Sequence, residues 1–232
     1  MANFPTSPGV ALNELDNTFI TGTPVKVGAA IIGPTVKGPV EIPTIVTSYS
    51  DYKNRFGGSF ISGSDTYSYL TSLAAYNYFV EGGESLLVAR VVSGSYTPAT
   101  SSIISNGLDA TSSSFSLETL SEGTIMNSDG TANSDGTLVN GTTDNIRWEI
   151  TAANTGSGTF NVLVRRGDDK TSDKIILESF NGVNLDPNST RYISKVIGDQ
   201  VVSYDSVNIQ INIATGSFTN ASRYVRVKDV TP

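Results

Sequence analysis

The sequence contains neither cysteine nor histidine. Without cysteine, disulfide frameworks and thiolate metal ligands are excluded. Without histidine, there is no Ser-His-Asp triad, no imidazole metal site and no histidine proton shuttle. An enzyme built from this chain would have to work with Asp, Glu, Ser, Lys or Tyr alone. We therefore expect that the protein is not an enzyme and that it holds no metal and no cofactor.

Basic charge and long apolar runs are also scarce. The chain has 15 basic and 22 acidic residues, for a net charge of -7. A protein that binds nucleic acid needs a basic surface to displace counterions from phosphates, so we expect no nucleic-acid partner. No run of about 18 or more apolar residues is present, and the first ten residues lack the features of a signal peptide. We expect no membrane insertion and a protein kept soluble in a cytoplasm.

Hydrophobic residues make up 38% of the sequence and aromatic residues 9%, enough for a packed core. Residues 1–22 are interrupted by proline and glycine and have only scattered apolar side chains. We expect an extended N-terminal arm there. Such an arm is either a disordered terminus or a segment that adds a strand to a neighbouring subunit.

Residues 23–95 predict a small α/β domain with the order strand, helix, helix, strand. Apolar runs at residues 25–33 and 85–92 are typical of buried strands. Residues 48–51 have the capping-box form that begins a helix, and Gly57 and Gly58 end it. A longer helix is expected to begin near residues 64–65. Its apolar stripe is predicted to pack in the core and consists of Tyr69, Leu73, Tyr76 and Val80.

Residues 96–200 are rich in Ser, Thr, Asn and Gly, and predict a β-rich domain of sandwich or barrel-like form. Clear strands are expected at residues 148–151, 160–164 and 174–180. Residues 201–232 predict further strands that lead into a missing C-terminal domain, because the sequence ends without an element to complete one. Within them a half-buried strand is expected from the alternation of Val207, Ile209, Ile211 and Ile213 with polar residues. The expected fold class is α+β.

Three motifs are candidates for a binding or catalytic site. The sequence Asn-Ser-Asp-Gly-Thr occurs at residues 127–131 and 133–137 and raises the possibility of a calcium loop, although two tandem turns fit better. Lys37 lies among glycines but lacks phosphate-loop spacing, which favours a solvated lysine. Arg165 and Arg166 stand beside Asp168 and Asp169, a pattern typical of a solvated turn. A glycosidase would require two of these carboxylates to face one cleft.

Several sequence blocks, taken in order, resemble the contractile phage tail sheath family, which is related to the sheaths of R-type pyocins and other contractile injection systems. The blocks are residues 7–16, 27–39, 46–58, 69–92 and 178–193. The resemblance covers about residues 5–95 and 145–200, and does not extend over residues 101–144. The family's large α/β sheath domain and C-terminal arm have no counterpart in the sequence.

The resemblance implies a structural subunit of a virion tail, assembled in the host cytoplasm. Such subunits polymerise as hexameric rings stacked into a helical sheath, and contract to drive an inner tube through the target cell envelope. The implied partners are other copies of the chain and the tail tube, baseplate and tail terminator proteins. The implied inter-subunit arm residues are Ser7, Pro8, Gly9, Val10, Leu12 and Leu15. The alternative is a β-rich receptor-binding or adhesin-like tail protein, which the Ser/Thr/Gly-rich residues 96–158 would fit.

Overall fold

The computed structural model describes residues 28–62, 64–94, 96–101, 104–105, 114–123, 132–154, 156–205, 207–208 and 210–231. Strands hold 44% of these residues and helices 13%. The prediction of an α+β fold with a small α/β domain is therefore wrong. The described chain is mostly β, with several small sheets and three helices. The prediction failed because the additional strands of residues 23–95 are only three residues long, too short to show a periodicity.

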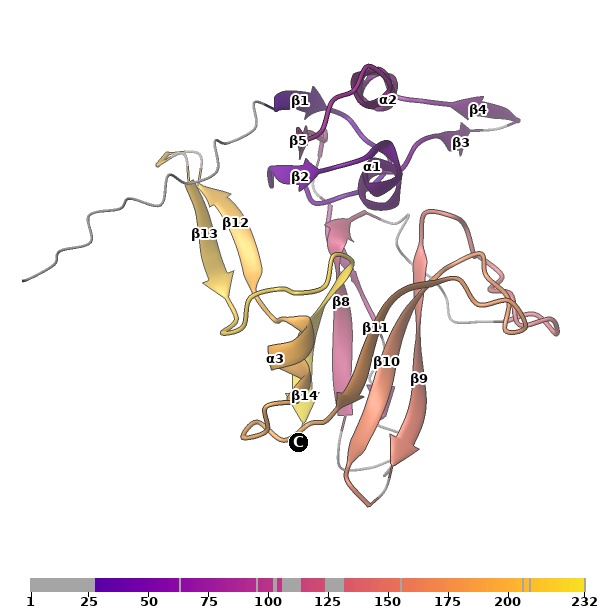
Figure 1. Cartoon of the computed structure of the whole chain (residues 1–232), viewed down its shortest axis with the longest axis vertical. Helices are drawn as coiled ribbons and strands as arrows, with labels where there is room; N and C mark the ends of the chain where they lie inside the picture. Colours follow the sequence, from indigo (N-terminus) through magenta and orange to yellow (C-terminus); the bar gives the residue numbers. More distant parts are fainter. Residues whose placement is uncertain are drawn as a thin grey trace, which may run out of the picture.

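The first unit of the fold is built on a three-stranded sheet (Figure 1). Strand β5 (Leu86–Arg90) lies in the centre, parallel to β1 (Ala29–Gly33) and antiparallel to β2 (Thr44–Val46). Helices α1 (Tyr49–Phe56) and α2 (Leu70–Val80) pack on one face, and β3 (Phe60–Ser62) and β4 (Asp65–Tyr67) form a separate hairpin. The buried core between sheet and helices consists of Val46, Tyr52, Phe56, Ala75, Leu86 and Val88.

The two helices differ in how well the sequence predicted them. For α1 the cap is confirmed: the Ser48 hydroxyl accepts a hydrogen bond from the Asp51 N–H at 3.1 Å, and Gly57 ends the helix with a φ of 76°. For α2 the predicted start near residues 64–65 is wrong. Those residues belong to the exposed hairpin, because Asp65 of β4 pairs with Ser62 of β3. The helix begins at Leu70.

The second unit contains two sheets that share one core (Figure 1). The first sheet has β10 (Thr159–Arg166) between β9 (Ile146–Asn154) and β11 (Ile176–Val183), all antiparallel. The second has β8 (Ser114–Glu122) between β14 (Val225–Thr231) and β6 (Pro98–Thr100), and β7 (Ile104–Ser105) also pairs with β8. Helix α3 (Ile193–Ile197) packs against β11 and β14. The rings of Phe115 and Phe160 stack between the sheets, 5.6 Å apart.

A third, smaller element leaves this core. Strands β12 (Val201–Asp205) and β13 (Gln210–Thr215) form a two-stranded antiparallel hairpin that projects from the second unit (Figure 1). Its base is fixed to the second unit, since the Ala221 and Ser222 N–H groups donate to the Ile197 carbonyl of α3 at 2.9 and 3.1 Å. After the hairpin the chain returns to the shared core as β14.

Candidate interaction surfaces

The predicted arm residues lie outside the described part of the chain. They are Ser7, Pro8, Gly9, Val10, Leu12 and Leu15. In the turn at residues 133–137, Asp135 bonds within the turn. Its carboxylate accepts hydrogen bonds from the Thr137 hydroxyl at 2.6 Å and from the Thr137 N–H at 3.1 Å. These bonds lower the pKa of Asp135. The other copy of the repeat, residues 127–131, is outside the described residues. Within the described ranges, no three acidic residues gather as a metal site would require.

Helix α2 places its apolar stripe outward, which contradicts the prediction that the stripe packs in the core. Its buried residues are instead the small Thr71, Ser72 and Ala75. The helix approaches the sheet so closely that a Cβ on Gly33 would lie 2.6 Å from the Thr71 hydroxyl oxygen, so only small side chains fit there. The α2 face, as we name the exposed stripe, consists of Leu70, Leu73, Tyr76 and Val80, with exposed fractions of 81%, 49%, 47% and 61%.

The three-stranded sheet is also covered on one face only. Ile32, Ile45 and Leu87 point away from the helices and are exposed. The register places Ile45 and Ala30 on either side of Leu87, so these side chains form a continuous apolar surface, the open sheet face. The strands predicted as buried are therefore buried on one side only within the described chain.

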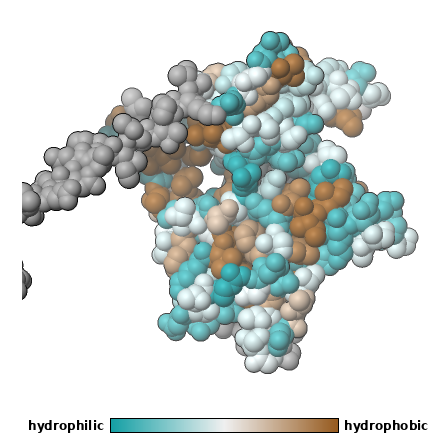
Figure 2. Space-filling view, in the orientation of Figure 1, coloured by the Kyte–Doolittle hydropathy of each residue, from teal (hydrophilic) through white to brown (hydrophobic). Residues whose placement is uncertain are grey.

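The β12–β13 hairpin shows the same behaviour. The alternation predicted for this strand is correct, because Ile211 and Ile213 share one side, paired with Tyr204 and Val202. The predicted half-burial is wrong for Ile211 and Ile213, which are 47% and 58% exposed; Ile209 is outside the described residues. We call the side formed by Val202, Tyr204, Ile211 and Ile213 the hairpin face. Figure 2 shows hydrophobic residues gathered over this hairpin.

By contrast, the junction between the two units is polar. Lys37 is 4% exposed; its ammonium donates to the Asp144 carbonyl at 2.9 Å and lies 3.7 Å from the Asp144 carboxylate. The prediction of a solvated lysine is therefore wrong. The partner lies 107 residues away in the sequence, so no local pattern indicated this contact. Burial lowers the pKa of Lys37, although Asp144 opposes this shift, and burial raises the pKa of Asp144.

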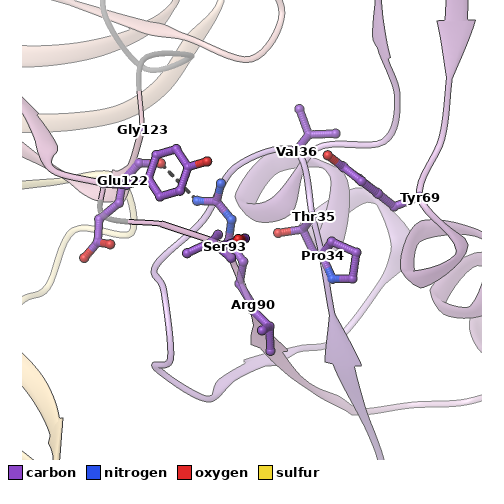
Figure 3. Close-up of a pocket in the computed structure, with 11 residues that line it drawn as sticks. Pro34, Thr35, Val36, Tyr69, Arg90, Ser93, Glu122 and Gly123 are labelled. Atoms are coloured by element: carbon purple, nitrogen blue, oxygen red, sulfur yellow. Dashed lines mark hydrogen bonds between the residues drawn. The ribbon is translucent and has the colours of Figure 1, made fainter.

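Arg90 fastens the same junction from strand β5. Its Nη1 donates to the backbone carbonyl of Gly38 at 2.7 Å. It also donates to the backbone carbonyl of Glu122 at 2.9 Å (Figure 3). Its Nε is buried and finds no acceptor among the described residues. Arg90 also lines a pocket of about 400 Å³ between the units, together with Thr35, Tyr69 and other residues. Because its bond to Glu122 crosses from β5 to β8, this arginine links the two units.

A buried charge network lies in the β9–β10–β11 sheet, where the sequence predicted a solvated turn. Asp169 is fully buried and accepts from Arg165 Nε at 2.7 Å and Nη2 at 2.8 Å. Arg165 also pairs with Glu149 at 2.9 Å. Burial works to raise the pKa of Glu149, but the hydrogen bonds and charges of Lys174 and Arg165 outweigh it and lower the pKa. Only the outer pair, Arg166 with Asp168, is partly solvated as predicted. The buried acids are thus neutralised by arginine, which gives them a structural role.

No protein-family model and no curated protein sequence matches this chain. No helix in the part of the chain that the structure describes is long and apolar enough to cross a membrane. The candidate interaction surfaces of the described chain are the α2 face, the open sheet face and the hairpin face, because each exposes apolar side chains. What they can do chemically is bind other apolar protein surfaces.

Proposed function

We propose that this chain is a structural subunit of a contractile tail sheath. The observation that carries the proposal is that three elements with regular apolar patterns leave their apolar faces exposed. Burying a leucine or isoleucine side chain stabilises by roughly 1.5–3 kcal/mol, so these faces favour association. A subunit inside a polymer has several neighbours and needs several such faces.

The charge distribution supports contact between identical copies. Helix α2 has no charged residue, and residues 210–221, which include β13, have none either. In a chain with a net charge of -7, uncharged surfaces are where two copies approach with the least repulsion. The proposed partners are thus other copies of the chain, arranged as stacked hexameric rings, and the tail tube, baseplate and tail terminator proteins.

The kind of assembly comes from the sequence resemblance to sheath proteins. In this proposal the protein resides in the virion tail after assembly in the host cytoplasm. It works by rigid-body repacking of subunit interfaces, which drives the inner tube through the target envelope. Such a mechanism requires no catalysis, nucleotide or cofactor within the subunit, and we propose that the protein is not an enzyme.

Immunogold electron microscopy on particles from the producing cells tests this function. The antibody is raised against residues 96–197, which include the β9–β11 sheet. We expect gold along the whole tail in both extended and contracted particles. Gold confined to a fibre tip or a baseplate would overturn the proposal and identify a receptor-binding protein instead.

A further inference from the structure

A pocket of about 400 Å³ lies between the two units of the fold (Figure 3). Its walls come from residues 34–36 after β1, from residues 90–93 at and after β5, from Tyr69 and Tyr96, and from residues 122–123 at the end of β8. Sites for small molecules in proteins have volumes of roughly 300–1,000 Å³. The pocket is therefore large enough to hold one small ligand, and its side chains indicate which kind.

Arg90 leaves one edge of its guanidinium group unpaired at this pocket. The residue is 6% exposed, and Nη1 makes both of its hydrogen bonds to described residues. Nε is buried and has no acceptor among the described residues. Nε and Nη2 together form the edge that pairs with the two oxygens of a carboxylate. Because a buried donor without an acceptor is costly, a carboxylate at this edge would be stabilising.

The opposite wall of the pocket has further features that favour an anion. The Tyr69 hydroxyl points into the pocket, on the side opposite Arg90 (Figure 3). The Tyr69 ring is held by stacking on Phe60, with 5.0 Å between the ring centroids. Tyr69 is also the N-cap of α2, so the positive end of the helix dipole lies at the same wall. A hydroxyl donor therefore stands opposite the guanidinium, next to a helix N-terminus.

One lining residue limits how much negative charge a ligand can carry. The Glu122 carbonyl accepts from Arg90, whereas the Glu122 carboxylate points away from the guanidinium (Figure 3). Burial raises the pKa of Glu122, and the charge of Arg90 opposes this shift. An ionised Glu122 repels a dianion about twice as strongly as a monoanion. Pro34, Val36 and Val92 line the pocket with apolar surface, which suits a ligand with an apolar body.

We propose that this junction pocket binds a monocarboxylate with a small apolar body. The carboxylate accepts hydrogen bonds from the unpaired edge of the Arg90 guanidinium and from the Tyr69 hydroxyl, and the apolar body contacts Val36 and Val92. This binding site goes beyond the proposed sheath function and does not rest on it. Arg90 belongs to the first unit and Glu122 to the second, so the bound ligand adds a contact where the two units meet.

Isothermal titration calorimetry of the intact chain with benzoate tests this site. At pH 7 we expect a Kd of about 1 mM or tighter. Benzamide has the same shape without the charge, and it should bind at least about tenfold more weakly, because hydrogen bonds to charged groups are stronger. Sulfate, a dianion, should also bind more weakly than benzoate. Absence of benzoate binding at about 10 mM, or equal binding of benzamide or sulfate, would overturn the inference.

A pair of tyrosine variants locates the contact. Tyr69→Phe removes only the hydroxyl and should raise the Kd for benzoate about three- to tenfold. The matched control is Tyr67→Phe, because Tyr67 stacks on the same Phe60 at 5.9 Å but does not line the pocket. Tyr67→Phe should leave the Kd unchanged. Equal Kd values for the two variants would contradict the contact with Tyr69.

A charge variant gives a readout in the opposite direction. Glu122→Gln removes the negative charge beside the pocket and should lower the Kd for benzoate about three- to tenfold. A residue that only supports the fold would not tighten binding when it is substituted. An unchanged or higher Kd in Glu122→Gln would contradict a carboxylate at Arg90.

Hydrogen exchange locates the ligand without a substitution. With saturating benzoate, the amides of Ser93 and Gly123, which line the pocket, should exchange more slowly, while those of β10 are unchanged. Slower exchange confined to the α2 face or the hairpin face would show binding to exposed apolar surface and overturn the inference.

The carboxylate can belong to a free small molecule or to an acidic side chain of a neighbouring copy. Benzoate titrations at two chain concentrations, about twentyfold apart, separate these sources by mass action. An apparent Kd that rises with chain concentration identifies competition by a neighbouring copy. A constant Kd shows that no copy competes and identifies a free small molecule as the source.

Discussion

Replacing Asp169 by asparagine should destabilise the second unit strongly. The Asp169 carboxylate is fully buried and accepts from Arg165 at 2.7 and 2.8 Å, from the Ile175 N–H at 2.9 Å and from Arg147 at 3.3 Å. Asparagine keeps the shape but removes the charge, and turns an amide donor toward donors of the guanidinium. The Arg165 side chain is only 3% exposed, so water cannot replace the lost partner.

The expected loss is about 3–5 kcal/mol in the free energy of unfolding, the range for breaking a buried ion pair by removing one partner. Whole domains are stable by only about 5–15 kcal/mol, so this is a large fraction. With a denaturant slope of about 2–3 kcal/mol per molar urea, the unfolding midpoint should fall by about 1–2.5 M.

The assay is equilibrium urea unfolding followed by tryptophan fluorescence. The chain has a single tryptophan, and Trp148 pairs with Val164, the residue before Arg165, so the signal reports on this sheet. The control is Asp168→Asn. Asp168 pairs with Arg166 in a partly solvated bridge, with side-chain exposures of 27% and 36%, and should lose about 0–1 kcal/mol. Equal midpoints for the two variants would refute the reasoning.

Three further predictions concern other elements. Glu118→Gln should lower stability at pH 7 by about 1–3 kcal/mol, since Glu118 pairs with Arg226 at 2.5 Å. Burial opposes ionisation there, but Arg226 and Lys228 lower the pKa of Glu118 below its ordinary 4.5. The stabilisation is thus present above pH 4.5 and lost as the pH falls through the folded-state pKa, so urea midpoints of the variant and the parent should converge in acid. Tyr52→Phe should cost nothing in thermal unfolding, because the buried Tyr52 hydroxyl has no hydrogen-bond partner among the described residues, and a measurable loss would contradict this. Ser48→Ala removes the cap of α1 and should cost about 1 kcal/mol in the same assay, whereas Ser50→Ala, inside that helix, should not.

Local patterns in the sequence predicted local structure well. The strand predicted at residues 160–164 is confirmed by β10, in which Phe160, Val162 and Val164 lie on one side and are fully buried. The cap at Ser48 and the helix end at Gly57 were confirmed for the same reason, since both depend on residues a few positions apart. Such signals are carried by the chain's own periodicity and turn chemistry.

Contacts between distant residues could not be predicted. Lys37 and Asp144 meet across the junction, and Arg165 reaches Glu149 across two strands, without any spacing rule that marks either pair. The three-residue strand β4 was taken for the start of a helix because so short a segment shows no period. For Asp169, burial depends on how three strands stack, which one strand's sequence does not contain.

The predictions for the α2 face and the hairpin face were wrong for a different reason. Periodicity shows which side chains share a face, but not what covers that face. Leu73 was predicted to pack in the core and Ile213 to lie on the buried side of a half-buried strand, on the assumption that the same chain provides the cover. In an assembly subunit the neighbour provides it, so the same pattern predicts an interface. The arm residues, Val10 and Leu12 among them, remain a prediction because they lie outside the described residues.

The distribution of polar and apolar contacts has a mechanical consequence for the proposed sheath. The two units are joined by a few directional bonds, from Lys37 to Asp144, from Arg90 to the Glu122 carbonyl, and from Arg223 to Asp51 at 3.3 Å. Polar junctions of this kind permit relative motion of domains more readily than apolar cores do. The apolar faces, meanwhile, are left for partners. In a polymer the contacts between copies would then contribute more stabilisation than the junction within each copy. A change in subunit packing would therefore move the two units as rigid bodies and leave both cores intact.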